Sequence, residues 1–142
     1  MLIDSSPVTT VISPGSSANL GPGFDVLGVA LDRYVWASDE QTCSGRGGES
    51  CWDDDFARIA FERAGGKGDL YFGFDLTPGR GLGFSAAARA AGAVLARVLA
   101  GDDPLEARRV AYDVVNELEG HGDNAAPSVF GGTFVIAGDL AH

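Results

Sequence analysis

The segment Pro78–Ala88, with the sequence PGRGLGFSAAA, constrains the fold of this chain more than any other. It joins a glycine-rich turn to an alanine-rich stretch directly after a strand-like run. This order predicts a strand over Leu70–Leu76, a loop over Thr77–Gly83 and a helix over Phe84–Ala100. Several backbone N–H groups and the positive end of the helix dipole then point at one place, which suits an anion, above all a nucleotide phosphate. The loop, a candidate phosphate loop, does not follow the Walker pattern, because no Gly-Lys-Ser/Thr ends it.

The composition is typical of one globular domain, because 45% of the 142 residues are hydrophobic, enough for a sizeable core. No apolar run reaches the roughly 18 residues of a membrane-spanning helix. Residues Met1–Ser6 contain neither a basic nor a long apolar stretch, so we expect no secretory signal, a cytoplasmic location and no membrane partner. In that setting Cys43 and Cys51 are expected to be free thiols, and two cysteines alone supply half of a tetrahedral zinc site.

The charge balance argues against a nucleic-acid partner. The net charge is −10, and a single lysine, Lys67, accompanies the arginines. Contacts to nucleic-acid phosphates need a basic face, which such a chain does not supply. The acidic residues are explained by solubility through self-repulsion. A GC-rich genome would also account for the scarcity of lysine, and a salt-loving host would give a similar acidic surface.

Strand and helix patterns mixed along the chain predict an α+β sandwich rather than a doubly wound sheet. Phe24–Leu31 is predicted as a short helix, because Leu27 and Leu31 have the spacing of one helix face. The three acids Asp53, Asp54 and Asp55 are expected to cap the helix that follows, with a carboxylate metal cluster as the alternative. The other predicted elements are a strand at Val8–Ile12, a loop at Ser13–Gly23, a strand at Arg33–Ser38, helices at Phe56–Ala64 and Leu105–Glu119, a helical turn at Ala125–Phe130 and a strand at Thr133–Ala137.

Two further polar segments complete a pattern with the phosphate loop. They are Ser16–Asp25 (SSANLGPGFD) and Glu119–Pro127 (EGHGDNAAP). In order and spacing the three segments resemble the GHMP kinases; the first and third resemble the homoserine kinases within that family, and the loop is similar to the one all members share. The resemblance covers most of residues 8–137. It implies a GHMP-kinase N-terminal ATP-binding domain, a ribosomal S5 domain 2-like α/β sandwich, over residues 1–142, with the family's C-terminal domain absent.

The resemblance also implies an activity: transfer of the γ-phosphoryl group of ATP to the side-chain hydroxyl of L-homoserine, a step towards threonine. It places Asn19 and Asp25 in the amino-acid pocket, where an ionised Asp25 would pair with the substrate ammonium. Mg²⁺ would be held by Glu119 and by the hydroxyl of Ser85, together with phosphate oxygens and water.

The remaining implied roles concern the acceptor hydroxyl and the nucleotide. His121, Asp123 and Asn124 would be the catalytic residues beside the acceptor, with His121 and Asn124 also binding the substrate. Phosphoryl transfer passes through a loose transition state, so alignment and charge neutralisation suffice without a strong base. The implied ATP-binding residues are Pro78, Gly79, Arg80, Gly81, Leu82, Gly83, Phe84, Ser85 and Ala86.

One residue of the loop departs from the family pattern. Phe84 stands where the family usually has a serine, which removes one hydroxyl donor, and we expect altered packing around the nucleotide rather than lost binding. Several of the other residues also have ordinary structural explanations. Ser85 could cap the helix, and Glu119 is a carboxylate at a helix C-terminus, where it opposes the dipole and invites a partner. Glu117 is an alternative ligand, although it points elsewhere on the helix.

Three other functions remain open from the sequence. The acceptor could be another small alcohol of a GHMP kinase. The chain could be a nucleotide-binding module without turnover. It could also form a homodimer through sheet edges or apolar surface.

Overall fold

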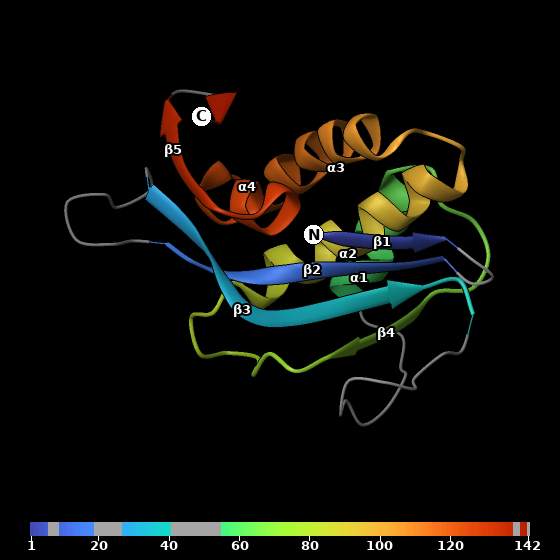
Figure 1. Cartoon of the computed structure of the whole chain (residues 1–142), viewed down its shortest axis with the longest axis horizontal. Coiled ribbons are helices and arrows are strands. Elements are labelled where there is room, and N and C mark those ends of the chain that lie inside the picture. Colours follow the sequence, from blue (N-terminus) through green and yellow to red (C-terminus); the bar gives the residue numbers. More distant parts are fainter. Residues whose placement is uncertain (6–8, 19–26, 41–54, 138–139, 142) are drawn as a thin grey trace.

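A computed structural model describes residues 1–5, 9–18, 27–40, 55–137 and 140–141 of the chain. Over these residues the fold is one sheet with helices on one of its faces (Figure 1). The strands are β1 (Leu2–Ser5), β2 (Thr9–Ser17), β3 (Leu27–Ser38), β4 (Tyr71–Phe74), β5 (Thr133–Ala137) and β6 (Leu140–Ala141). The helices are α1 (Asp55–Arg63), α2 (Phe84–Leu99), α3 (Pro104–Glu119) and α4 (Gly122–Phe130).

The long strand β3 organises the sheet. It pairs with β2 along one side, while its other side pairs with β5 near its start and with β4 near its end. All of these pairings are antiparallel, with Leu27 opposite Val135 and Val35 opposite Phe74. β4 leads into the phosphate loop and β5 follows α4, so both candidate segments are attached to the same strand.

The core lies between the sheet and α2, whose alanines are buried (Figure 1). Helices α2 and α4 lie against β2 and β3, and α1 and α3 pack against α2. Small residues allow this close packing: a Cβ placed on Gly92 of α2 would lie 2.2 Å from the carbonyl oxygen of Ala57 in α1. The helix that follows the phosphate loop, α2, is therefore packed between the sheet and the other helices.

The fold class is confirmed, and so are most helices. α2 and α3 match their predicted ranges to within one residue, and in the structure the Asp103 side chain caps α3 with Pro104 in the first turn. α4 is longer than the single turn predicted and begins at Gly122. The strands β1 and β6 were not predicted.

Two predictions around the first glycine-rich segment are wrong. The helix predicted over Phe24–Leu31 is a strand from Leu27 onward, continuous with the strand predicted at Arg33–Ser38. A spacing of four residues fits one face of a helix and also one face of a strand, and pairing with β2 and β5 decided the outcome. The predicted loop Ser13–Gly23 begins later than expected, because β2 continues to Ser17.

Some sequence predictions fall on residues outside those described. They include the proposed substrate residues Asn19 and Asp25, the cysteines Cys43 and Cys51, and the acids Asp53 and Asp54. Asp55 lies in the first turn of α1, where its charge complements the helix dipole. Within the described ranges, no helix has both the length and the apolarity needed to cross a bilayer.

Candidate active site

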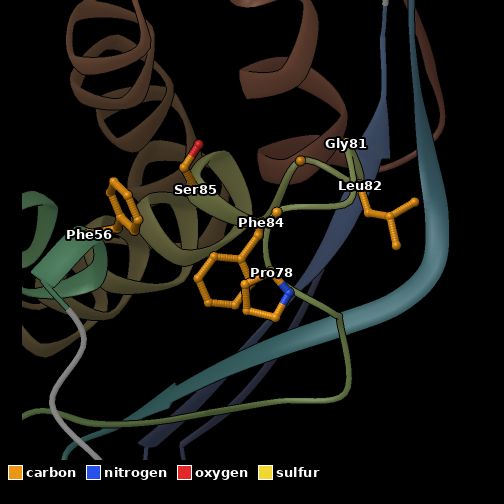
Figure 2. Close-up of a pocket in the computed structure, with 8 residues that line it drawn as sticks. Phe56, Pro78, Gly81, Leu82, Phe84 and Ser85 are labelled. Atoms are coloured by element: carbon orange, nitrogen blue, oxygen red, sulfur yellow. The ribbon is translucent and has the colours of Figure 1, made fainter.

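The phosphate loop forms a pocket at the N-terminus of α2 (Figure 2). Its volume is about 320 Å³. Gly79, Gly81 and Gly83 adopt positive φ angles of 75°, 67° and 66°, which only glycine adopts without strain. The residues that line the pocket are Phe56, Pro78, Gly79, Gly81, Leu82, Gly83, Phe84 and Ser85. Of the residues expected to bind ATP, Arg80 is exposed and Ala86 is buried within α2, and neither lines the pocket.

The start of α2 carries no side-chain cap. The N-cap residue is Gly83, no side-chain cap hydrogen bond occurs among the residues that the structure describes, and the first turn contains no acidic residue. Ser85 is therefore not the cap that the sequence allowed; it lies in the first turn, and Figure 2 shows its side chain directed towards the helices, away from Phe84. An uncapped helix N-terminus facing a glycine-rich pocket leaves N–H donors and a positive dipole end for an anion.

The loop is anchored to β2 at an irregularity in that strand. The β2–β3 register shifts between Pro14 and Ser16, and there the backbone N–H of Ser16 donates to the carbonyl of Leu82 at 3.0 Å. A Cβ on Gly83 would lie 2.2 Å from Ser16 Oγ. Gly83 is thus required by contact with β2, whereas a Cβ on Gly81 would meet no atom within 4 Å.

Phe84 belongs to an aromatic cluster that joins the loop to the sheet. Its ring lies edge-on to Phe74 at 5.1 Å and to Phe72 at 6.1 Å between centroids. Such edge contacts stabilise beyond the area that they bury. The phenyl ring therefore fixes the start of α2 on β4 and forms a wall of the pocket (Figure 2).

The third sequence segment and the rest of α4 contact strand β2 through serine hydroxyls. Ser16 Oγ donates to Asn124 Oδ1 at 2.8 Å, and Ser128 Oγ lies 3.5 Å from Ser16 Oγ. Ser13 Oγ donates to the carbonyl of Ser128 at 2.8 Å, which holds α4 on β2. With its Oδ1 accepting from Ser16, Asn124 keeps its amide NH₂ group as a donor for another ligand.

His121 and Asp123 form a pair at the N-terminus of α4. His121 Nδ1 lies 2.5 Å from Asp123 Oδ1, which also accepts from the N–H of Asn124 at 3.0 Å. Asp123 is fully buried, and its Oδ2 has no hydrogen-bond partner among the described residues. The His121 side chain is 48% exposed. If Nδ1 carries the proton donated to Asp123, Nε2 is the acceptor of the ring, so the pair can orient a hydroxyl.

Glu119, expected as the magnesium ligand, forms an ion pair with Arg89 through its Oε1. Both side chains are largely buried, at 16% exposed for Arg89 and 11% for Glu119. Arg89 is therefore the partner expected for a carboxylate at the C-terminus of α3. Glu117, two residues earlier, pairs with Arg63 at the surface, more than half exposed, which removes it from the site.

The donor set agrees with a hard cation only in part. The Glu119 carboxylate and the Ser85 hydroxyl are oxygen donors of the kind that Mg²⁺ prefers. Nevertheless, no group of three or more His, Cys, Asp or Glu side chains that could hold a metal occurs in the described part of the chain. A cation here would need phosphate oxygens and water to complete its coordination, and it would meet Arg89 at Glu119.

Three residues of the site were not assigned a role from the sequence. Ser16 connects the loop to Asn124, Phe56 lines the pocket, and Arg89 pairs with Glu119. Ser16 lay within a noted motif, so a signal existed for it. Arg89 and Arg97 are the charged residues of the alanine-rich helix α2, and a charge among these alanines was the sequence sign of a role for Arg89.

Comparison with known proteins supports the interpretation of the fold. The family model described as the GHMP kinases N terminal domain matches residues 54–132. The homoserine kinase of Corynebacterium kroppenstedtii is 41% identical over 89% of this chain and 45% of its own length. The homoserine kinase of Corynebacterium glutamicum is 40% identical over the same shares. The crystal structure of homoserine kinase from Cytophaga hutchinsonii superposes with a TM-score of 0.65, at 22% identity, over 100% of this chain and 52% of that one.

The fold and the phosphate loop define a GHMP-type α/β domain, and the chain belongs to the GHMP kinase family. Its curated relatives carry the name homoserine kinase. The chain spans about half the length of these relatives.

Proposed function

We propose that residues 1–142 form the ATP-binding N-terminal domain of a small-molecule kinase that phosphorylates the hydroxyl of L-homoserine. The observation that carries the proposal is the uncapped start of α2 at the glycine-rich pocket, connected through Ser16 to Asn124. The first feature suits a nucleotide phosphate, and the second supports a role for the Asn124 amide in binding the acceptor hydroxyl. The substrate follows from the names of the relatives that are about 40% identical.

In this function the chain's residues act mainly by positioning. The loop amides and the α2 dipole bind and orient the phosphates. Asn124, held by Ser16, donates its NH₂ group to the acceptor hydroxyl, and His121, held by Asp123, accepts from it through Nε2. Magnesium, when bound through Glu119 and Ser85, supplies neutralisation of phosphate charge. Asn19 and Asp25 are the proposed contacts to the amino-acid part of the substrate.

Calorimetry and a coupled assay for ADP test the proposal together. The 142-residue chain is expected to bind ATP or ADP, and Gly81→Val, which adds bulk in open space at the pocket, is expected to weaken binding at least tenfold. Gly68→Val, also at positive φ and free of neighbours, is the matched control. ADP production with L-homoserine, absent with mevalonate, supports the substrate. The reverse preference refutes the substrate, and absence of nucleotide binding refutes the function.

A nucleotide-binding module without turnover is the second candidate, and the Arg89–Glu119 pair favours it because the pair engages the carboxylate proposed for magnesium. The distinguishing experiment adds the remaining half found in the full-length relatives as a separate polypeptide. ADP production that appears on its addition supports the kinase. Nucleotide binding that stays without turnover supports the module.

A further inference from the structure

Arg89 is held at the border of the pocket by two contacts. It follows Ser85 by one helical turn, so both side chains lie on the same face of α2. Its guanidinium pairs with Glu119, and its Cζ lies 4.9 Å from the ring centroid of Phe56, which itself lines the pocket. Stacking of this kind fixes the guanidinium plane. The pocket wall and the ion pair are therefore parts of one assembly.

The Arg89 guanidinium also has an N–H donor without an acceptor among the described residues. Arginine has five N–H donors, and Arg89 Nε is buried with no acceptor among the described residues. Planar, multidentate donors of this type are suited to phosphate as much as to carboxylate. An anionic ligand in the neighbouring pocket thus offers Arg89 acceptors that Glu119 alone does not.

The pair has a direct consequence for any cation. Glu119 is largely buried, so its charge requires a partner, and Arg89 supplies one. A divalent cation that approaches the carboxylate meets a fixed positive charge in the same place. Binding of the cation and pairing with Arg89 therefore exclude each other at Glu119 Oε1.

We infer that Arg89 competes with the divalent cation for Glu119, and that a nucleotide polyphosphate in the pocket relieves this competition by accepting the guanidinium. Arg89 is a positioning residue that makes metal binding dependent on the nucleotide. The competition follows from the ion pair alone. Only its relief by nucleotide rests on the proposed function.

Titration with Mn²⁺ alone, followed by its paramagnetic resonance signal, tests the competition without nucleotide or turnover. The wild-type chain is expected to bind Mn²⁺ weakly, and R89Q at least tenfold more tightly. The double variant R89Q/E119Q should lose this gain. R63Q, which removes the partner of the exposed Glu117, is the matched control and should leave the affinity unchanged. Equal Mn²⁺ affinity in wild type and R89Q overturns the competition. If R89Q does not fold, R89K decides: an affinity above that of wild type supports the inference, and an equal affinity overturns it.

Repeating the titrations with saturating ADP tests the relief. ADP should tighten Mn²⁺ binding more in wild type than in R89Q, because only wild type has a competitor to remove. An equal effect in both overturns the relief. If neither protein binds ADP, the proposed function fails and the relief fails with it, while the Mn²⁺ comparison still decides the competition.

Discussion

The backbone N–H of Ser16 donates to the carbonyl of Leu82 at 3.0 Å, and this bond connects strand β2 to the phosphate loop. The hydroxyl of the same serine donates to Asn124 at the start of α4. One residue thus holds both the segment proposed for the nucleotide and the segment proposed for the acceptor. The positions of the two segments are therefore coupled.

Ser16→Ala is expected to lower the free energy of unfolding by about 1 kcal/mol, because it removes a buried hydrogen bond from Asn124 Oδ1. Urea denaturation measures this change. Ser17→Ala, at the adjacent position on the opposite face of β2, is the control and should change stability by less than about 0.5 kcal/mol. Equal effects of the two substitutions would show that the hydrogen bond from Ser16 to Asn124 does not stabilise the fold.

Comparing Gly83→Ala with Gly79→Ala distinguishes the cost of a steric overlap from the cost of backbone strain at positive φ. Both glycines have positive φ, which costs an alanine about 1 kcal/mol. Only at Gly83 would the new Cβ overlap Ser16, and this overlap raises the expected cost to about 3 kcal/mol. Thermal unfolding of both variants measures the difference. A Gly83→Ala variant no less stable than Gly79→Ala would show that the loop does not rest on β2.

Gly28→Ala is expected to be the more damaging of two glycine substitutions remote from the loop. Its Cβ would lie 1.8 Å from the carbonyl oxygen of Asp123, so β3 and α4 would have to separate. Gly68→Ala, at positive φ but with no atom within 4 Å, is the comparison and should cost only about 1 kcal/mol. The midpoint of chemical unfolding decides; a Gly28→Ala variant as stable as Gly68→Ala contradicts the close approach.

Glu119→Gln and Glu117→Gln compare a buried with an exposed ion pair on the same helix. Loss of the Glu119 charge leaves Arg89 largely buried without its counter-ion and should cost about 2–4 kcal/mol. Loss of the Glu117 charge should cost less than about 1 kcal/mol, since that pair is exposed. Urea denaturation at two salt concentrations tests both values. The Glu117 effect should shrink with salt, whereas the Glu119 effect should persist. Matching salt dependence would place both pairs at the surface.

The sequence predicted best what local chemistry determines. The predicted start of α3 is correct to within one residue, because the Asp103 cap and the fixed φ of Pro104 act within a few residues. The glycine-rich turn predicted before α2 is also present, and its Gly79, Gly81 and Gly83 have positive φ angles.

The failures all concern partners far apart in the chain. Residues Leu27–Leu31 form a strand because β2 and β5 pair with them, and their spacing alone fits a helix equally well. Ser16 finds its partners at Leu82 and Asn124, and Arg89 finds Glu119 on another helix. No local sequence pattern predicts such contacts, since only the assembled fold brings these groups together.

The shared attachment of β4 and β5 to β3 has a mechanical consequence. Both strands lead to or from the two halves of the candidate site, and β3 bonds to one through Val35 and to the other through Leu27. A distortion applied at either half is therefore transmitted along a single continuous backbone. The amide protons of β3 should accordingly exchange with solvent in concert, and ligand occupancy on one side should slow exchange along its whole length.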